Sequence, residues 1–557
     1  MNLHTAANVF RYRLLRTLLL LAMALVFASC AEGEKQSGTG SSESQEATKS
    51  SSSGEAVSAG SGPSDVTAAI DQVTSEPRYE HSSWGFSVRD LSTGEVLFER
   101  SGDKMFVPGS IFKTFSGATV LKGYGPDHRF ETPIYRTDAP NQGVLEGDLV
   151  LVASGDLSLG LREQSDGTMA FANAPEFDHT YANVAPQTGL VGDPLAGLNE
   201  LAQQVRDAGI REVRGDVVID DRLFKPWESP DGLIAPIWVN ENRIDLTAKP
   251  TSQGEAAKVD WRPKTAAYTV KNAVKTVAKN GETSLEVDEP ESGVFRISGQ
   301  IAAGSDPAIR VGEVEDPAAF ARTALIEALE DAGIEVSANT TGSNPSDLLP
   351  PEDSYSESQR VAQHVSAPLE EFTKVIFKTS HNPGAQLMTC LSAVKAGSRD
   401  CQAGLEREFE VFTGLGVSPK STFVFDGAGS DDHNRTTPDA MTKFLRAVDE
   451  QSYGKAFRSS LAIVGEEGTQ AQALKDSPAV GKIRVKDGTR VIPTPAGQGI
   501  VLGKTLVGYV EAESGRRLMI SIMTGNVPVA SAQEIFPVVE NVTEDQDELA
   551  AEIQQGY

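Results

Sequence analysis

Two side chains that could form a nucleophile and its base, Ser110 and Lys113, lie three residues apart. On a helix this spacing brings both side chains to one face. A serine hydroxyl attacks a carbonyl carbon only when a base removes its proton, and a lysine becomes that base when burial lowers its pKa. The apolar run over 110–121 predicts both a helix and this burial. A serine at a helix start is, by itself, more often a cap than a nucleophile.

Two later segments carry polar side chains of related chemistry. Ser380-His-Asn382 begins a run that is compatible with a helix, and Lys486-Asp-Gly-Thr489 follows the strand pattern of 481–485. The order S-x-x-K, S-x-N and K-x-G, with the last motif on a strand, is typical of penicillin-recognising serine acyl enzymes. In this order the chain resembles the class C low-molecular-mass penicillin-binding proteins, which are D-Ala-D-Ala carboxypeptidases and endopeptidases.

The resemblance extends beyond the three motifs, over roughly residues 80 to 525, in the order of the family. The similar segments are Val107 to Thr114, Leu145 to Asp156, Val213 to Asp221, Asn240 to Asn242, Asp426 to Gly429 and Val464 to Thr469. The resemblance implies an α/β (α+β) fold, a penicillin-binding-protein or serine β-lactamase-like transpeptidase domain that a large mixed α/β insertion splits.

The same resemblance implies a catalytic role for five residues. Ser110 would attack the carbonyl carbon of the penultimate D-alanine, and Lys113 would accept its proton. Ser380 and Lys486 would relay a proton to the departing amine. Asn382 would hold Lys113 and the substrate amide. We expect the reaction to pass through an acyl enzyme.

Three further residues are candidates for substrate binding. The backbone amide of Thr489, beyond Gly488, would form an oxyanion hole with the amide of Ser110, and its hydroxyl would bind the terminal carboxylate of the peptide. Asp156 is a candidate partner for an amino group on the peptide, although it is equally well explained as a turn residue at a strand end.

The third motif departs from the family at Asp487, where a threonine or serine is usual. A carboxylate there would repel the carboxylate of a substrate or of penicillin, unless Lys486 or Arg490 neutralises it. Lys504-Thr505-Leu506 is an alternative third motif, but it lies too close to the next strand pattern to precede it.

A second departure follows the Asp426-Gly-Ala-Gly429 loop, where Asp432 stands in place of an arginine of the family. An arginine there could meet an acidic peptide side chain, and an aspartate cannot. The preference of the family for a particular stem peptide therefore does not transfer to this chain.

The N-terminal residues have the pattern of a secretory signal peptide. Three arginines precede the apolar run 18–27, and Phe27-Ala-Ser-Cys30 resembles a bacterial lipobox, in which the cysteine is lipid-modified. Cleavage without lipidation is the alternative. We expect an extracytoplasmic, membrane-anchored lipoprotein, with the Ser/Gly-rich residues up to 66 as a flexible tether.

The length and the net charge of the chain limit the classes of protein and of partner that are possible. The chain has 557 residues and a formal net charge of −28, so a single small module is excluded and nucleic acid is an unfavourable partner. We predict a signal peptide over 1–29, a lipid-anchored tether over 30–66, a catalytic domain over 67–125 and 356–557, and inserted domains over 126–355.

The chain has three cysteines. With Cys30 assigned to lipidation, Cys390 and Cys401 are left as a candidate disulfide in an oxidising compartment, or as two buried thiols. The seven histidines are scattered without zinc spacing, so we expect neither a metal nor an organic cofactor.

These features favour a serine D-Ala-D-Ala carboxypeptidase/endopeptidase that hydrolyses the stem peptides of peptidoglycan and is inhibited by β-lactams. The alternative is a catalytically impaired homologue that binds cell-wall peptides or acts as a scaffold, and Asp487 favours it. A hydrolase of β-lactams or esters is disfavoured by the large insertion.

Overall fold

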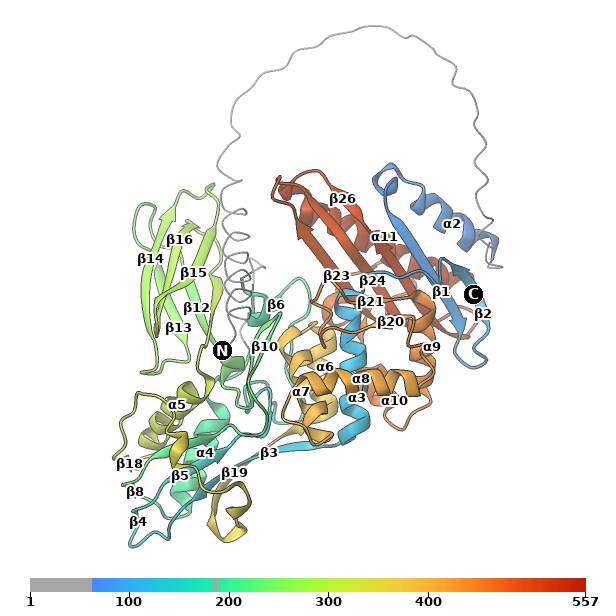
Figure 1. The fold of residues 1–557 in the computed structure, drawn as a ribbon. Helices are drawn as coiled ribbons and strands as arrows, with labels where there is room; N and C mark the ends of the chain where they lie inside the picture. The colour runs from blue at the N-terminus through green and yellow to red at the C-terminus, as the bar shows by residue number, and fades with distance from the viewer. Residues whose placement is uncertain (1–62, 184–187, 190) are drawn as a thin grey trace.

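The computed structural model describes residues 63–183, 188–189 and 191–557 (Figure 1). The predicted signal peptide, Cys30 and almost all of the predicted tether lie outside the described residues. Within the described part of the chain, no helix combines the length and the apolar character that a membrane crossing needs.

Helix α2 (Ser64–Thr74) begins inside the segment that we predicted as a tether and includes the last three residues of that segment. Its Val66 and Ile70 are buried in one core with residues of α11 (Ile535–Gly556). Burial of these two apolar side chains stabilises α2 against the body of the protein.

A seven-stranded sheet forms the centre of the catalytic body, and it joins the two ends of the folded chain. Strand β1 pairs antiparallel with β25 from Ser83↔Gly525 to Asp90↔Leu518. The strands in spatial order are β2 (Val96–Arg100), β1 (Ser83–Asp90), β25 (Arg517–Gly525), β24 (Gly499–Glu511), β23 (Ile483–Pro493) and β22 (Ala462–Ile463), with β26 (Val527–Val529) beside β24.

The two faces of this sheet pack against different helices. On β25, Leu518, Ile520 and Ile522 belong to the core beneath α11 and α2, whereas Met519 and Met523 belong to the core on the opposite face. This alternation follows from the period of two of a β-strand. The opposite face carries α3 (Lys113–Tyr124), α6 (Leu369–Lys378), α7 (Asn382–Lys395), α8 (Gln402–Gly414), α9 (Pro438–Asp449) and α10 (Gly454–Ser460).

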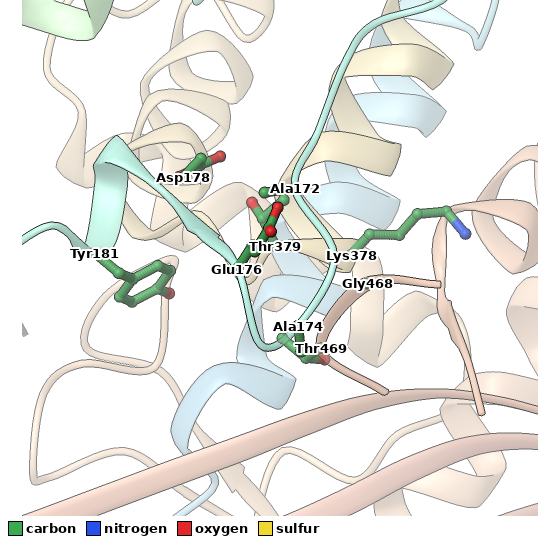
Figure 2. Close-up of a pocket in the computed structure, with 9 residues that line it drawn as sticks. All are labelled: Ala172, Ala174, Glu176, Asp178, Tyr181, Lys378, Thr379, Gly468 and Thr469. Atoms are coloured by element: carbon green, nitrogen blue, oxygen red, sulfur yellow. The ribbon is translucent and has the colours of Figure 1, made fainter. Parts of the chain in front are cut away.

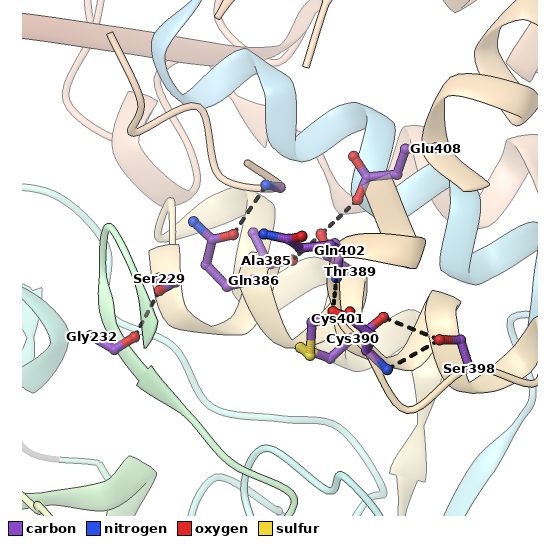
Figure 3. The surroundings of a disulfide bond; sticks show 12 residues. Ser229, Gly232, Ala385, Gln386, Thr389, Cys390, Ser398, Cys401, Gln402 and Glu408 are labelled. Carbon is purple, nitrogen blue, oxygen red and sulfur yellow. Dashed lines mark hydrogen bonds between the residues drawn. A yellow bond between two sulfur atoms is a disulfide. The ribbon is translucent and has the colours of Figure 1, made fainter. Parts of the chain in front are cut away.

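Helix α3 is buried over nearly its whole length, from Lys113 to Leu121. The ring of Phe115 packs against Phe444 of α9 and Phe412 of α8, with ring centroids 4.6 and 5.0 Å apart. A disulfide between Cys390 of α7 and Cys401, directly before α8, ties two neighbours of α3 together (Figure 3). The helix that carries the predicted base therefore lies in a packed apolar interior.

The insertion leaves the catalytic body after α3 and returns before α6. Its entry strand β3 (Arg129–Arg136) pairs antiparallel with its exit strand β19 (Arg360–Pro368). They belong to a four-stranded sheet with β5 (Leu149–Val152) and β9 (Val217–Asp220). The other elements of this part are α4 (Ala196–Asp207), α5 (Pro317–Asp331) and the short strands β4 (Val144–Leu145), β8 (Glu212–Val213) and β18 (Glu335–Val336).

A second part of the insertion is built of small sheets (Figure 1). Its strands are β12 (Arg243–Lys249), β13 (Lys258–Arg262), β17 (Ala308–Glu313), β14 (Thr269–Val277), β15 (Ser284–Glu291), β16 (Val294–Ala302), β6 (Phe177–Asp178) and β7 (Thr188–Gly189). The hairpin β10 (Trp227–Ser229) and β11 (Gly232–Ile234) reaches α7 of the catalytic body. The remaining short strands of the catalytic body are β20 (Thr422–Phe423) and β21 (Arg435–Thr436).

Candidate active site

The first predicted pair meets where a tight turn becomes a helix. Ser110 lies in the 3₁₀ turn Gly109–Phe112, and Lys113 is the first residue of α3. Lys113 Nζ lies 2.7 Å from Ser110 Oγ, and the lysine side chain is fully buried. The predicted proximity of the two side chains is therefore present in the fold.

Lys113 makes three hydrogen bonds to three different segments. Its Nζ contacts Ser110 Oγ at 2.7 Å, Asn382 Oδ1 at 2.6 Å and the carbonyl oxygen of Ala428 at 3.0 Å. Burial, followed by the nearby charge of Lys486, lowers the pKa of Lys113 to about 7. Near neutral pH a large fraction of these side chains is therefore an amine that can accept a proton.

The second motif lies between α6 and α7. Asn382 begins α7, and the imidazole Nδ1 of His381 accepts the amide hydrogen of Gly384 at 2.8 Å as a cap of that helix. Ser380 has a φ of 59°, a left-handed conformation that residues with a side chain rarely adopt. The hydroxyl of Tyr181, from the insertion, donates to the carbonyl oxygen of Ser380.

A buried ionic network joins the insertion to this second motif. Glu241 Oε2 lies 2.8 Å from His381 Nε2 and 2.8 Å from His179 Nε2, and its Oε1 accepts from Arg162 Nε. The cations around it hold the pKa of Glu241 well below its usual range, although burial opposes them. Because an unpaired carboxylate would be costly here, this network fixes His381 relative to the insertion.

Asp231, at the tip of the β10–β11 hairpin, supports the asparagine of the second motif. Its carboxylate accepts hydrogen bonds from Asn382 Nδ2 at 2.8 Å, from Gln386 Nε2 at 2.7 Å and from Ser430 Oγ at 2.8 Å. A carboxylate can only accept, so Asn382 must turn its NH₂ group to Asp231 and its oxygen to Lys113. Sequence reasoning missed Asp231 because it lies in a polar hairpin without a motif.

The third motif lies on β23, directly beside the serine turn. A side chain at Gly488 would approach the amide nitrogen of Ser110 to 2.8 Å, and one at Gly109 would approach the amide nitrogen of Thr489 to 2.7 Å. Gly109 also has a φ of 56°. Both glycines are therefore required for the close approach that brings the amides of Ser110 and Thr489 together.

The structure pairs Asp487 with two lysines. Its carboxylate lies 3.1 Å from Lys486 Nζ and 3.6 Å from Lys504 Nζ, and accepts from Thr469 Oγ1 at 2.7 Å. The lysines and Thr469 hold the pKa of Asp487 below its ordinary value, although burial opposes them. When both lysines are protonated, the group carries a net positive charge, so the expected repulsion of a substrate carboxylate is compensated.

Lys504, which belongs to the alternative third motif, lies on β24. The register of β23 with β24 places it opposite Thr489, and Lys504 Nζ donates to Thr489 Oγ1 at 3.1 Å. That bond leaves the hydroxyl hydrogen of Thr489 free to point at an acceptor. The length of the turn between β23 and β24 sets which residues face each other across the two strands. That length is the sequence signal that could have identified Lys504 as the residue opposite Thr489.

Arg490 does not neutralise Asp487, because it pairs with Asp432 instead. Of the two residues that were expected to neutralise Asp487, Lys486 is therefore the one that pairs with it. Asp432 carries a negative charge where the family has an arginine, but Arg490 of β23 compensates that charge within the site.

Figure 2 shows a small cavity where the insertion meets the catalytic body. The side chains of Tyr181, Thr379 and Thr469 line it, and Thr469 also binds Asp487. The segments that carry the second and third motifs therefore approach one another next to residues of the insertion.

Asp156 lies apart from this group. It is 3% exposed, and its Oδ1 accepts from the amides of Ser158 at 2.9 Å and Leu159 at 3.0 Å, as in a turn. Its other contact is with His364 of β19. Among the described residues, its hydrogen bonds and ion pairs do not include the residues around Ser110, and burial raises its pKa.

Comparisons with known proteins agree with this arrangement. The model of the D-Ala-D-Ala carboxypeptidase 3 (S13) family matches residues 66–544. A D-alanyl-D-alanine carboxypeptidase of an Actinomadura species is 27% identical over 84% of this chain and 83% of the relative. D-alanyl-D-alanine carboxypeptidase DacB of Haemophilus influenzae is 22% identical over 74% of this chain and 80% of the relative.

Among solved structures, penicillin binding protein 4 of Haemophilus influenzae aligns over 87% of this chain and 99% of its own, with a TM-score of 0.66 and 18% identity. The expected mixed α/β penicillin-binding-protein fold is thereby confirmed. Since the family model matches residues 66–544, which are most of the chain, the chain belongs to the D-Ala-D-Ala carboxypeptidase 3 (S13) family.

Proposed function

We propose that this chain is an active serine D-Ala-D-Ala carboxypeptidase/endopeptidase that cuts peptidoglycan stem peptides through an acyl enzyme on Ser110. The observation that carries the proposal is the contact of Lys113 with both Ser110 Oγ and Asn382 Oδ1 inside a buried site. Relatives named D-alanyl-D-alanine carboxypeptidases support the reaction and substrate class.

In the first step, the neutral amine of Lys113 removes the hydroxyl proton of Ser110. Its two N–H groups keep their bonds to Asn382 Oδ1 and to the carbonyl oxygen of Ala428, and its lone pair faces Ser110 Oγ. Ser110 Oγ then bonds to the carbonyl carbon of the penultimate D-alanine. The amides of Ser110 and Thr489 stabilise the negative charge that develops on the carbonyl oxygen.

In the second step, the bond to the terminal D-alanine breaks and its amine takes up a proton. Ser380 and Lys486 relay this proton, which comes from the protonated Lys113. Water then attacks the ester carbon, and Ser110 recovers its proton as the shortened peptide leaves. Burial lowers the pKa of Lys486, which makes it a better donor in the relay than an exposed lysine.

Recognition of the terminal carboxylate rests on Lys504 and Thr489. Lys504 is 3% exposed and donates to the hydroxyl of Thr489 at 3.1 Å. The hydroxyl of Thr489 then donates to the substrate carboxylate, with the positive charge of Lys504 behind it. In this chain, Lys504 and Asp487 together replace the neutral residue that the family has between the lysine and the glycine.

The first prediction concerns acylation by a β-lactam. A fluorescent penicillin will label the wild-type chain covalently, because Ser110 attacks its carbonyl carbon, and Ser110→Ala will abolish the labelling. Lys504→Met will slow labelling about 10- to 100-fold, because a buried positive charge that faces the carboxylate is lost. Gel fluorescence measures the label, and D-alanine release from a pentapeptide measures turnover.

A matched variant separates an active enzyme from an impaired homologue. If the wild-type chain stays unlabelled and Asp487→Thr restores labelling, the chain is impaired by its third motif and the proposal is wrong. If neither chain is labelled although both unfold cooperatively at similar temperatures, Ser110 is not an acylated nucleophile.

The second prediction concerns pH. Because only the neutral amine of Lys113 can act as a base, the acylation rate will fall about tenfold per pH unit below about pH 7 and level off above it. Asp487→Thr removes a charge that raises the pKa of Lys113, so its rising limb will lie at lower pH. Stopped-flow labelling from about pH 5 to about pH 9 measures this dependence. A rate that does not depend on pH would exclude Lys113 as the base.

The third prediction concerns Asp231 as a positioning residue. Asp231→Asn keeps one acceptor oxygen, so its NH₂ group must face either Asn382 Nδ2 or Gln386 Nε2, and the orientation of the Asn382 oxygen towards Lys113 is no longer enforced. We expect the acylation rate to fall about 10- to 100-fold, with a larger effect on kcat than on KM. Glu228→Gln, at an exposed position of the same hairpin, is the matched control and will acylate normally. Equal rates in both variants would contradict the role.

The fourth prediction concerns location. We propose that lipidated Cys30 anchors the enzyme to a membrane on the extracytoplasmic side, with the residues before Ser64 as a tether. In a bacterial host, the wild-type chain will partition with membranes, and Cys30→Ala will be released into the soluble extracytoplasmic fraction because it cannot carry the lipid. Membrane association that persists in Cys30→Ala would refute the anchor.

A further inference from the structure

A group of side chains outside the catalytic site has the composition of a metal centre. His364 lies on β19, Asp156 and Glu163 lie on the loop after β5, and Glu200 lies on α4. Both His364 and Asp156 are 3% exposed. The proposed reaction uses none of these four residues.

The distances between the candidate ligand atoms are those of ligands around one ion. His364 Nε2 lies 3.5 Å from Asp156 Oδ2 and 3.4 Å from Glu163 Oε1, and all three atoms lie within 4.8 Å of one another. Ligands at about 2.0–2.2 Å from a tetrahedral zinc ion are roughly 3.4 Å apart. A direct N–H···O hydrogen bond is shorter, at about 2.7–3.2 Å.

Two of these atoms have no hydrogen-bond partner among the described residues, namely Asp156 Oδ2 and His364 Nε2. The other oxygen of Asp156 accepts from the amides of Ser158 and Leu159, which fixes the carboxylate and leaves Oδ2 directed at His364. A buried polar atom without a partner is destabilising, and an ion between the two atoms would satisfy both.

The second nitrogen of His364 is held as it is in many metal sites. Its Nδ1 lies 2.8 Å from Glu200 Oε2. When Nδ1–H donates to a carboxylate, the lone pair of Nε2 is available to a metal, and the carboxylate strengthens the imidazole as a ligand. Three carboxylates around one histidine also leave negative charge that a divalent cation would neutralise.

We propose that Asp156, Glu163 and His364 bind a divalent transition-metal ion, with zinc as the best match to two carboxylates and one imidazole, and that Glu200 orients His364. The ion is structural. It joins the exit strand β19 to the loop after β5, and Glu163 Oε1 also accepts from the amide of Ala367 at 3.0 Å, two residues before α6 begins. Since α6 ends two residues before Ser380, this centre stabilises the connection that holds the second motif.

The experiment uses the full chain, purified after treatment with a chelator and then supplied with zinc chloride. Mass spectrometry of the desalted protein will give about one zinc per chain for wild type and less than a tenth of that for His364→Gln, which retains a side chain of similar length. Zinc will raise the Tm of the wild type by several degrees and leave that of His364→Gln unchanged. His433→Gln, at an exposed histidine outside the group, is the matched control and will bind zinc normally.

If His364→Gln does not fold, the variant Asp156→Asn and the metal probe Co²⁺ test the same group of residues. Asp156→Asn retains the turn acceptor, and it will lose the visible d–d absorption that Co²⁺ gives in wild type. Zinc bound equally by wild type and both variants would place the ion elsewhere and overturn the proposal. A Tm of the wild type that responds neither to zinc nor to chelator would assign the group to a protonated histidine and also overturn it.

Penicillin labelling of the same samples separates this proposal from the proposed function. Metal content and Tm report on the group around His364, whereas labelling reports on Ser110. Zinc binding without labelling would refute only the proposed function, and labelling without zinc binding would refute only the metal centre.

Discussion

The burial of Lys113 is the constraint on which the rest of the structure depends. A lysine in an apolar interior loses hydration, and its charge is tolerated only where acceptors surround it. Here three acceptors come from three separate segments, namely Ser110, Asn382 and Ala428. Any displacement of one segment leaves a polar hydrogen of the lysine unpaired. The same burial lowers the pKa of the lysine to about 7. The packing around Lys113 therefore also makes it suitable as a base.

The insertion helps to hold the catalytic body in place. Glu241 pairs with His381, the hydroxyl of Tyr181 binds the carbonyl of Ser380, and the carboxylate of Asp231 determines which way the amide of Asn382 faces. These contacts reach all three residues of the second motif from one inserted unit. The left-handed backbone of Ser380 costs free energy, and contacts of this kind allow it to persist.

In the third motif, two lysines compensate a carboxylate that departs from the family pattern. Asp487 replaces a neutral residue of the family pattern, and taken alone it opposes binding of a carboxylate. Lys504, opposite Thr489 on the neighbouring strand, returns a positive charge to the same place. Arg490 compensates Asp432 in the same way. The acidic positions that raised doubt about activity are each one half of an ion pair.

From its sequence alone, this protein is identifiable as a serine acyl enzyme with an insertion, because S-x-x-K, S-x-N and K-x-G are short local patterns on a helix, a helix start and a strand. The strand pattern before the third motif also predicts part of β23 (Ile483–Pro493). The partners of Asp487, the role of Asp231 and the position of Asp156 beside His364 depend on tertiary structure. Each of these features depends on residues that are far apart in the chain, or that face each other only when two strands pair in the correct register. The local periodicity of the sequence therefore cannot predict them.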